Sequence, residues 1–290
     1  MADERHRLTY MAKLAEQVER YNDMAQFTKT LVTMLPLDFP DSSEEYRAAK
    51  ANGTSTSILL DDERNQLSVA CKNKVGALRT SWRVLVSWLE TLLSKLDHEQ
   101  NASSDELTIS KKIEICRAYA KEVEQELNEI CDEVIELLDN YLIKNAHAGG
   151  AESRVFYLKM KGDYFRYKVE VASAETRKEL SDKSEEAYKK AWETATSELK
   201  ATHPIRLGLA LNFSVFHYEI RGEPPMAQQL AKDAFEKGIQ DMGDDEQSNT
   251  YKDSKLILQL LRDNLTLWAS ENQEQSQEQC ELQNEEQYEN

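Results

Sequence analysis

Lysine, arginine and tyrosine side chains are concentrated in the stretch VFYLKMKGDYFRYKVEV at residues 155–171. Lys159 and Arg166 are seven residues apart there, and Lys72 and Arg79 have the same spacing in an earlier stretch, RNQLSVACKNKVGALRTSWRV. Residues seven apart on a helix point within about 20° of the same direction, because two turns take about 7.2 residues. Each pair therefore puts two cations on one helix face, where they could form a local basic site.

A simpler interpretation of these cations stays open at this point. Arg166 is close in sequence to Asp163 and Glu170, and it could form an ordinary ion pair with either carboxylate on a solvated surface. The charge of the whole chain bears on the choice. With a formal net charge of −17 over 290 residues, the protein repels nucleic acid and anionic membranes, so we expect basic partners or a local basic site.

Motifs for other kinds of chemistry are missing from the sequence. The five histidines form no HExxH pair, and the four cysteines form no CxxC pair or zinc-ligand spacing. The Gly149-Gly150 pair is not followed by the GK[ST] of a phosphate-binding loop. The sequence thus predicts no metal site, no cofactor and no catalytic residues, and we expect the protein not to be an enzyme.

Helices must position the basic residues, because apolar residues recur at three- and four-residue spacing along nearly the whole chain. The low content of 9 Gly and 5 Pro agrees with this interpretation. No strand is predicted, and the two longest helices favour an all-α bundle or stacked array. The nine predicted helices cover residues 3–20, 22–35, 62–96, 105–143, 152–174, 182–201, 204–222, 224–242 and 248–270.

Two segments do not fit the helical domain predicted for residues 1–271. Residues 36–61 contain Pro, Gly and Ser/Thr clusters and are much longer than a usual connection between helices, so we interpret them as an insertion. Residues 272–290 are rich in Glu and Gln without Lys or Arg, and we expect a disordered acidic tail. No apolar run is long enough to insert into a membrane, and we expect the protein to be cytoplasmic.

Four long segments closely resemble signature segments of the 14-3-3 family. They are the two basic stretches above together with HPIRLGLALNFSVFHYEI at 203–220 and YKDSKLILQLLRDNLTLW at 251–268. The match covers most of residues 8–270 in the correct order. It implies nine antiparallel helices and an amphipathic groove that binds a phosphoserine or phosphothreonine segment in extended form. By the same resemblance, the phosphate is held by Lys72, Arg79, Arg166 and Tyr167.

The resemblance also implies which residues line the peptide-binding groove. Asn212 and Asn264 would hydrogen-bond the backbone of the bound segment, and apolar residues of the same two helices would line the other side. Helical spacing agrees, since residues 260, 264, 267 and 268 share one face. One departure is Leu78, where the family often has a second arginine. The full set of groove residues is Lys159, Leu211, Asn212, Val215, Glu219, Leu260, Asn264, Leu267 and Trp268.

A homodimer is a further implication of the resemblance. The first helix would pack against the third and fourth helices of a second copy. The matching residues are Leu14, Val18, Arg20, Asp23, Ser81, Leu85, Trp88, Tyr119, Glu122 and Glu126. Glu122 stands where a lysine would usually meet Asp23, and Val18 and Trp88 are bulkier than the common choices. We therefore expect a homodimer that is weaker than usual or differently angled.

Two functions follow as hypotheses. The first is an adaptor that binds phosphorylated client proteins and clamps, masks or bridges them without catalysis. The alternative is a phosphate-independent helical scaffold that binds acidic or amphipathic segments. The acidic tail adds a regulatory hypothesis: if Ser270 or Ser276 were phosphorylated, the tail would compete for the groove at high effective concentration. A tail that only aids solubility is the other interpretation.

Overall fold

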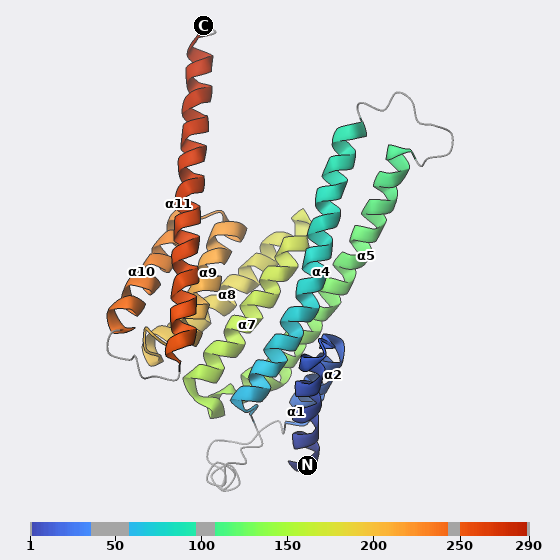
Figure 1. Ribbon diagram of the computed structural model, residues 1–290, viewed down its shortest axis with the longest axis vertical. Coiled ribbons are helices and arrows are strands. Elements are labelled where there is room, and N and C mark those ends of the chain that lie inside the picture. Colours follow the sequence, from blue (N-terminus) through green and yellow to red (C-terminus); the bar gives the residue numbers. More distant parts are fainter. Residues whose placement is uncertain (1, 36–57, 97–107, 243–249, 289–290) are drawn as a thin grey trace. The chain divides into compact units, whose positions relative to one another are not determined.

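The computed structural model describes residues 2–35, 58–96, 108–242 and 250–288. Every regular element in these ranges is helical (Figure 1). In chain order these ranges contain ten α-helices, two π-helical turns and one 3-10 turn. The all-α prediction is confirmed. The chain divides into two compact units: unit 1 comprises residues 1–149 and 167–176, and unit 2 comprises residues 150–166 and 177–290. Helix α7 (Gly150–Val171) contributes residues to both units, and the first three residues of the next helix, 174–176, also belong to unit 1.

Unit 1 is built on α1 (Ala2–Gln17), α2 (Tyr21–Thr33), α4 (Asp61–Leu96) and α5 (Ile109–Leu137). The long helices α4 and α5 lie side by side, and α2 packs on both α1 and α4 (Figure 1). Small side chains permit this close packing, because Ala12, Ala15 and Ala70 are buried around Met24. After α5 the chain continues through a π-helical turn, Leu138–Leu142, the short helix α6 (Ile143–Asn145) and a 3-10 turn, Ala146–Gly149.

Unit 2 contains α8 (Ala174–Glu198), α9 (Pro204–Val215), α10 (Pro224–Met242) and α11 (Tyr251–Tyr288), with a π-helical turn, Phe216–Arg221, after α9. The first part of α7 packs on α8. A Cβ added to Gly162 of α7 would lie 2.8 Å from the ring of Tyr188 of α8. Tyr188 is fully buried and stacks on Phe213 of α9 with a centroid distance of 5.3 Å. The core of this unit therefore ties α7, α8 and α9 together.

Helix boundaries lie within three residues of the predictions except in three places. Pro204 opens α9, and the backbone N–H of Ile205 donates to Nδ1 of His203, 3.2 Å away, which caps this helix. The helix predicted from 182 begins instead at Ala174, because Ser173 turns the chain there and its carbonyl accepts from the N–H of Thr176, 3.2 Å away.

The other two differences concern the ends of long helices. The helix predicted from 105 starts at Ile109, where the side chain of Thr108 accepts from the N–H of Lys111. Helix α11 continues to Tyr288, across the segment expected to be a disordered tail, since Glu and Gln are good helix formers. The domain boundary at 271 stays a prediction. Most of the predicted insertion, residues 36–57, lies outside the described residues.

No helix in the described ranges combines the length and the apolar character that crossing a membrane requires.

Candidate functional site

Helix α7 carries two carboxylates seven residues apart, Asp163 and Glu170, and each contacts cations that the sequence singles out. Asp163 belongs to unit 2 and Glu170 to unit 1. The seven-residue spacing puts both on one side of the helix.

In unit 1, Glu170 binds the side chains of two arginines on α4. Nε and Nη2 of Arg79 donate to the two carboxylate oxygens of Glu170 over 2.9 and 2.7 Å. Nη2 of Arg83 donates to the same carboxylate over 3.1 Å. The guanidinium of Arg79 also lies 4.1 Å from the ring centroid of Tyr167 on α7. Arg79 is therefore fixed on one edge by a carboxylate and on one face by an aromatic ring.

Lys72 is also one of the four residues predicted to bind phosphate. It lies on α4, seven residues before Arg79. Its side chain is exposed. It makes no hydrogen bond or ion pair with any residue that the structure describes. Its ammonium group is thus available to an anion that approaches this face of α4.

In unit 2, the buried carboxylate of Asp163 accepts hydrogen bonds from three different helices. The donors are Nζ of Lys159 at 2.8 Å, the hydroxyl of Tyr188 at 2.5 Å and Nδ2 of Asn212 at 2.7 Å. Nη2 of Arg166 lies 3.7 Å from the same carboxylate. Asp163 thus gathers Lys159, Arg166 and Asn212, which the sequence analysis placed at the site separately.

The electrostatics of this cluster favour an ionised Asp163. Burial raises the pKa of the carboxyl, but the nearby charges of Lys159 and Arg166 and the hydrogen bonds outweigh it, so the pKa lies below its ordinary value. Burial and the neighbouring carboxylate raise the pKa of Tyr188 well above its ordinary value. Tyr188 therefore stays a neutral hydroxyl that donates to Asp163, while it accepts from Nε of Arg166 at 3.2 Å.

The predicted groove residues lie on α7, α9 and α11 and on the turn that follows α9. Leu260 and Leu267 are 42% and 53% exposed, which leaves two leucines of α11 open to solvent. A Cβ at Gly208 of α9 would lie 3.9 Å from Cε of Lys159 and 3.9 Å from Cδ1 of Ile257, so the three helices approach one another there. Four further predicted groove residues are partly buried or exposed, namely Leu211, Val215, Glu219 and Asn264.

Trp268 differs from the other predicted groove residues. Only 4% of it is exposed, and its ring stacks on Tyr218 with a centroid distance of 4.6 Å. The hydroxyl of Tyr218 in turn donates to Glu271 over 2.5 Å. Trp268 thus packs mainly in the core that α9, α10 and α11 share, and it offers little surface to a ligand.

The residues predicted at a dimer interface all belong to unit 1 and are mostly exposed. Leu14, Val18, Trp88 and Tyr119 expose between 39% and 63% of their surface, unusually much for large apolar side chains. Charged and polar side chains accompany them on the same helices, and Ser81 donates to the carbonyl of Ala77.

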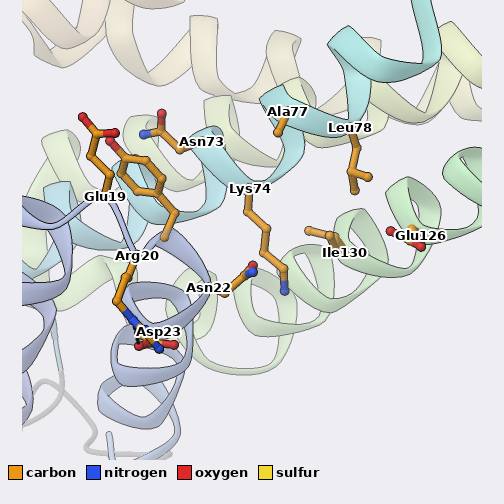
Figure 2. Close-up of a pocket in the computed structure, with 11 residues that line it drawn as sticks. Glu19, Arg20, Asn22, Asp23, Asn73, Lys74, Ala77, Leu78, Glu126 and Ile130 are labelled. Carbon is orange, nitrogen blue, oxygen red and sulfur yellow. Dashed lines mark hydrogen bonds and ion pairs between the residues drawn. The ribbon is translucent and has the colours of Figure 1, made fainter. Parts of the chain in front are cut away.

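A pocket of about 460 Å³ adjoins these residues between the start of α2 and the helices α4 and α5. Arg20 and Asp23 line it on the α2 side, and they form a 2.5 Å ion pair with each other. Glu126 lines it from α5 and Leu78 from α4 (Figure 2). Three residues assigned to the dimer interface therefore meet at one hollow, and Leu78 gives it an apolar wall where an arginine would be charged.

Sequence reasoning overlooked Tyr188 and did not assign a role to Asp163 beyond an ion pair. A signal for Asp163 was present, because it stands four residues after Lys159 and three before Arg166. No local signal marks Tyr188, which comes from another helix. Within the described ranges, no group of three or more His, Cys, Asp or Glu side chains could hold a metal ion.

Comparison with known proteins agrees with the resemblance seen in the sequence. A model of the 14-3-3 protein family matches residues 11–269. The 14-3-3 protein eta of Homo sapiens is 46% identical over 272 residues, which cover 94% of this chain and 97% of that protein. The 14-3-3 protein eta of Bos taurus has the same identity and coverage. Because the match extends over nearly the whole chain, this protein belongs to the 14-3-3 family.

Proposed function

We propose that this protein is an adaptor that binds phosphoserine and phosphothreonine segments of client proteins and performs no catalysis. Membership of the 14-3-3 family supports this role in general. The observation that carries the proposal is the orientation of Arg79, whose guanidinium is held by Glu170 and Tyr167. In the proposed site, Lys72, Arg79, Arg166 and Tyr167 together hold the phosphate.

The chemistry of these four side chains suits a phosphate monoester. Such a group has a charge of about −1.5 to −2 and three acceptor oxygens. Two guanidinium groups, an ammonium group and a phenol hydroxyl supply donors of the required kinds. Each charge-assisted hydrogen bond contributes roughly 1.5–3 kcal/mol. After the costs of ordering the peptide, we expect a dissociation constant of roughly micromolar size.

The groove on unit 2 is proposed to bind the backbone and apolar side chains of the same segment. Asp163 is ionised and can only accept hydrogen bonds, so the amide nitrogen of Asn212 must point toward it. The amide oxygen of Asn212 is then left to accept from a peptide N–H. The other proposed groove residues are Lys159, Leu211, Val215, Glu219, Leu260, Asn264 and Leu267. Trp268 would contribute only the 4% of its surface that is exposed.

Clamping or bridging of clients requires two binding sites, and we propose that a homodimer supplies them. The exposed apolar side chains of unit 1, including Val18 and Trp88, would be covered in such a dimer. Glu122 is exposed on α5 and adds a negative charge to this face. The dimer is accordingly proposed to be weaker than one with a lysine at that position.

Fluorescence anisotropy with a pair of peptides tests the proposed function. A labelled Arg-Ser-x-phosphoserine-x-Pro peptide and its unphosphorylated twin are titrated with the full chain. We expect only the phosphorylated peptide to bind. Equal binding of both would instead support the phosphate-independent scaffold. If neither binds, the titration is repeated after deletion of 272–290; recovered binding would support competition by the tail, and continued absence would contradict the adaptor function.

A further inference from the structure

Glu170 is a negatively charged residue in a site proposed to bind an anion. By its charge alone, the carboxylate of Glu170 would disfavour the binding of phosphate. Its side chain is only 10% exposed, and it accepts three hydrogen bonds from Arg79 and Arg83. A carboxylate that is buried and bonded to this extent contributes to the geometry of its partners as well as to the local charge.

The contacts of Arg79 determine which of its N–H groups can still donate to a ligand. A guanidinium group has two edges, and each edge can donate two N–H hydrogen bonds to one anion. Glu170 occupies the side edge, formed by Nε and Nη2, and Tyr167 covers one face. Arg79 makes no other hydrogen bond with the part of the chain that the structure describes. The end edge, formed by Nη1 and the second N–H of Nη2, therefore remains for the ligand.

The charge balance explains why the negative sign of Glu170 need not weaken binding. Glu170 together with Arg79 and Arg83 has a formal charge of +1. Without the carboxylate the charge would be +2, but the two guanidinium groups would repel each other and lose their anchor. Arg83 is already 57% exposed and would be free to turn toward solvent. Ordering both side chains again on binding would cost conformational entropy.

We infer that Glu170 is a positioning residue of the phosphate site, and that its carboxylate strengthens the binding of a phosphorylated ligand by holding Arg79 with its end edge presented. The inference rests on the proposed function, because it names a residue that acts through Arg79 at the same site. It goes beyond the four residues that would touch the phosphate.

The test compares Glu170→Gln and Glu170→Asp with the unaltered chain in the phosphopeptide titration. Glutamine removes the charge that grips both arginines, whereas aspartate keeps the charge on a shorter side chain. We expect the glutamine variant to bind about tenfold more weakly or worse, with partial recovery in the aspartate variant. Glu136→Gln is the control, since Glu136 is exposed on α5 and makes no hydrogen bond or ion pair with the described residues. It changes the net charge equally and should leave affinity unchanged.

A second comparison separates positioning from a general effect on the fold. In an Arg79→Lys background the side chain no longer has a side edge for Glu170 to hold, so Glu170→Gln should then weaken binding less than about twofold. Equal losses in both backgrounds, or a glutamine variant that binds as well as or better than the unaltered chain, would overturn the inference. Failure of the unaltered chain to prefer the phosphorylated peptide would instead overturn the proposed function, so the two failures are distinguishable.

Discussion

Arg79 and Arg166 are the two guanidinium groups on which the proposed phosphate site depends, and both are substantially buried. Replacing either by alanine removes charge-assisted hydrogen bonds to the ligand. We expect each variant to lose about 2–5 kcal/mol of phosphopeptide binding free energy, measured by anisotropy. Arg154→Ala, on the same helix as Arg166, is the control, because Arg154 pairs with Glu198 at the surface. Unchanged affinity in both test variants would contradict the assignment.

Loss of the buried carboxylate of Asp163 should affect the stability of the fold strongly. Its replacement by asparagine leaves Lys159 and Arg166 without their buried carboxylate. At pH 7 we expect Asp163→Asn to lower the free energy of unfolding by about 3–5 kcal/mol, measured by urea denaturation.

The difference in stability between the unaltered chain and Asp163→Asn should depend on pH in a definite direction. The pKa of Asp163 is lower in the folded protein than its ordinary value. Its stabilising contribution is therefore fully present above the unfolded pKa of about 3.9 and is lost as the pH falls through the folded pKa. Urea denaturation at pH values from 7 to 3 should show the gap between the unaltered chain and Asp163→Asn closing in acid. A gap that stays constant would show that ionisation of Asp163 does not stabilise the fold.

At the scale of the helices, the contact of α7 with α8 depends on the absence of a side chain at Gly162. A Cβ there would lie 2.8 Å from the ring of Tyr188, and the ring is fixed because its hydroxyl donates to Asp163. We expect Gly162→Ala to destabilise the protein by about 1–3 kcal/mol despite the better helix propensity of alanine.

Gly76 provides a matched comparison. It also lies inside a helix, α4, but a Cβ added to it would meet nothing within 4 Å. Gly76→Ala should stabilise the protein by about 0.4–1 kcal/mol. Thermal and urea unfolding of both variants measure the difference, and a similar effect at both glycines would argue against close packing as the cause.

The helices were predictable because their apolar periodicity is long and regular, as in α4, where the predicted range 62–96 differs from the observed Asp61–Leu96 by one residue. The start of α8 was missed, since the strongly polar residues before 182 hide the apolar pattern.

For the site, helical spacing pairs Lys72 with Arg79 and Lys159 with Arg166. It cannot reveal that Tyr188 and Asn212 converge on Asp163, because those contacts join distant parts of the chain.

For the whole molecule, the proposed homodimer depends on charges on α5. Glu122 and Glu126 are both acidic, and Asp23 on α2 would face this helix in a second copy. We expect Glu122→Lys to replace a repulsion by an attraction and to tighten the dimer, by about 0.2–1 kcal/mol for an exposed pair. Sedimentation velocity over a range of concentrations measures this. Glu124→Lys, two residues away and on another face of α5, should have no such effect.

The contacts around Asp163, which join three helices, also bear on how this protein could change. Gly162, Asp163, Tyr188 and Asn212 contact one another in a fixed pattern: the glycine makes room for the ring, the ring hydroxyl bonds the carboxylate, and the carboxylate orients the amide. A substitution at one position disrupts the contacts of the others, whereas matched substitutions at several positions can restore these contacts. In a library randomised at these four positions and selected for retained binding, surviving sequences should therefore show strong statistical dependence among them.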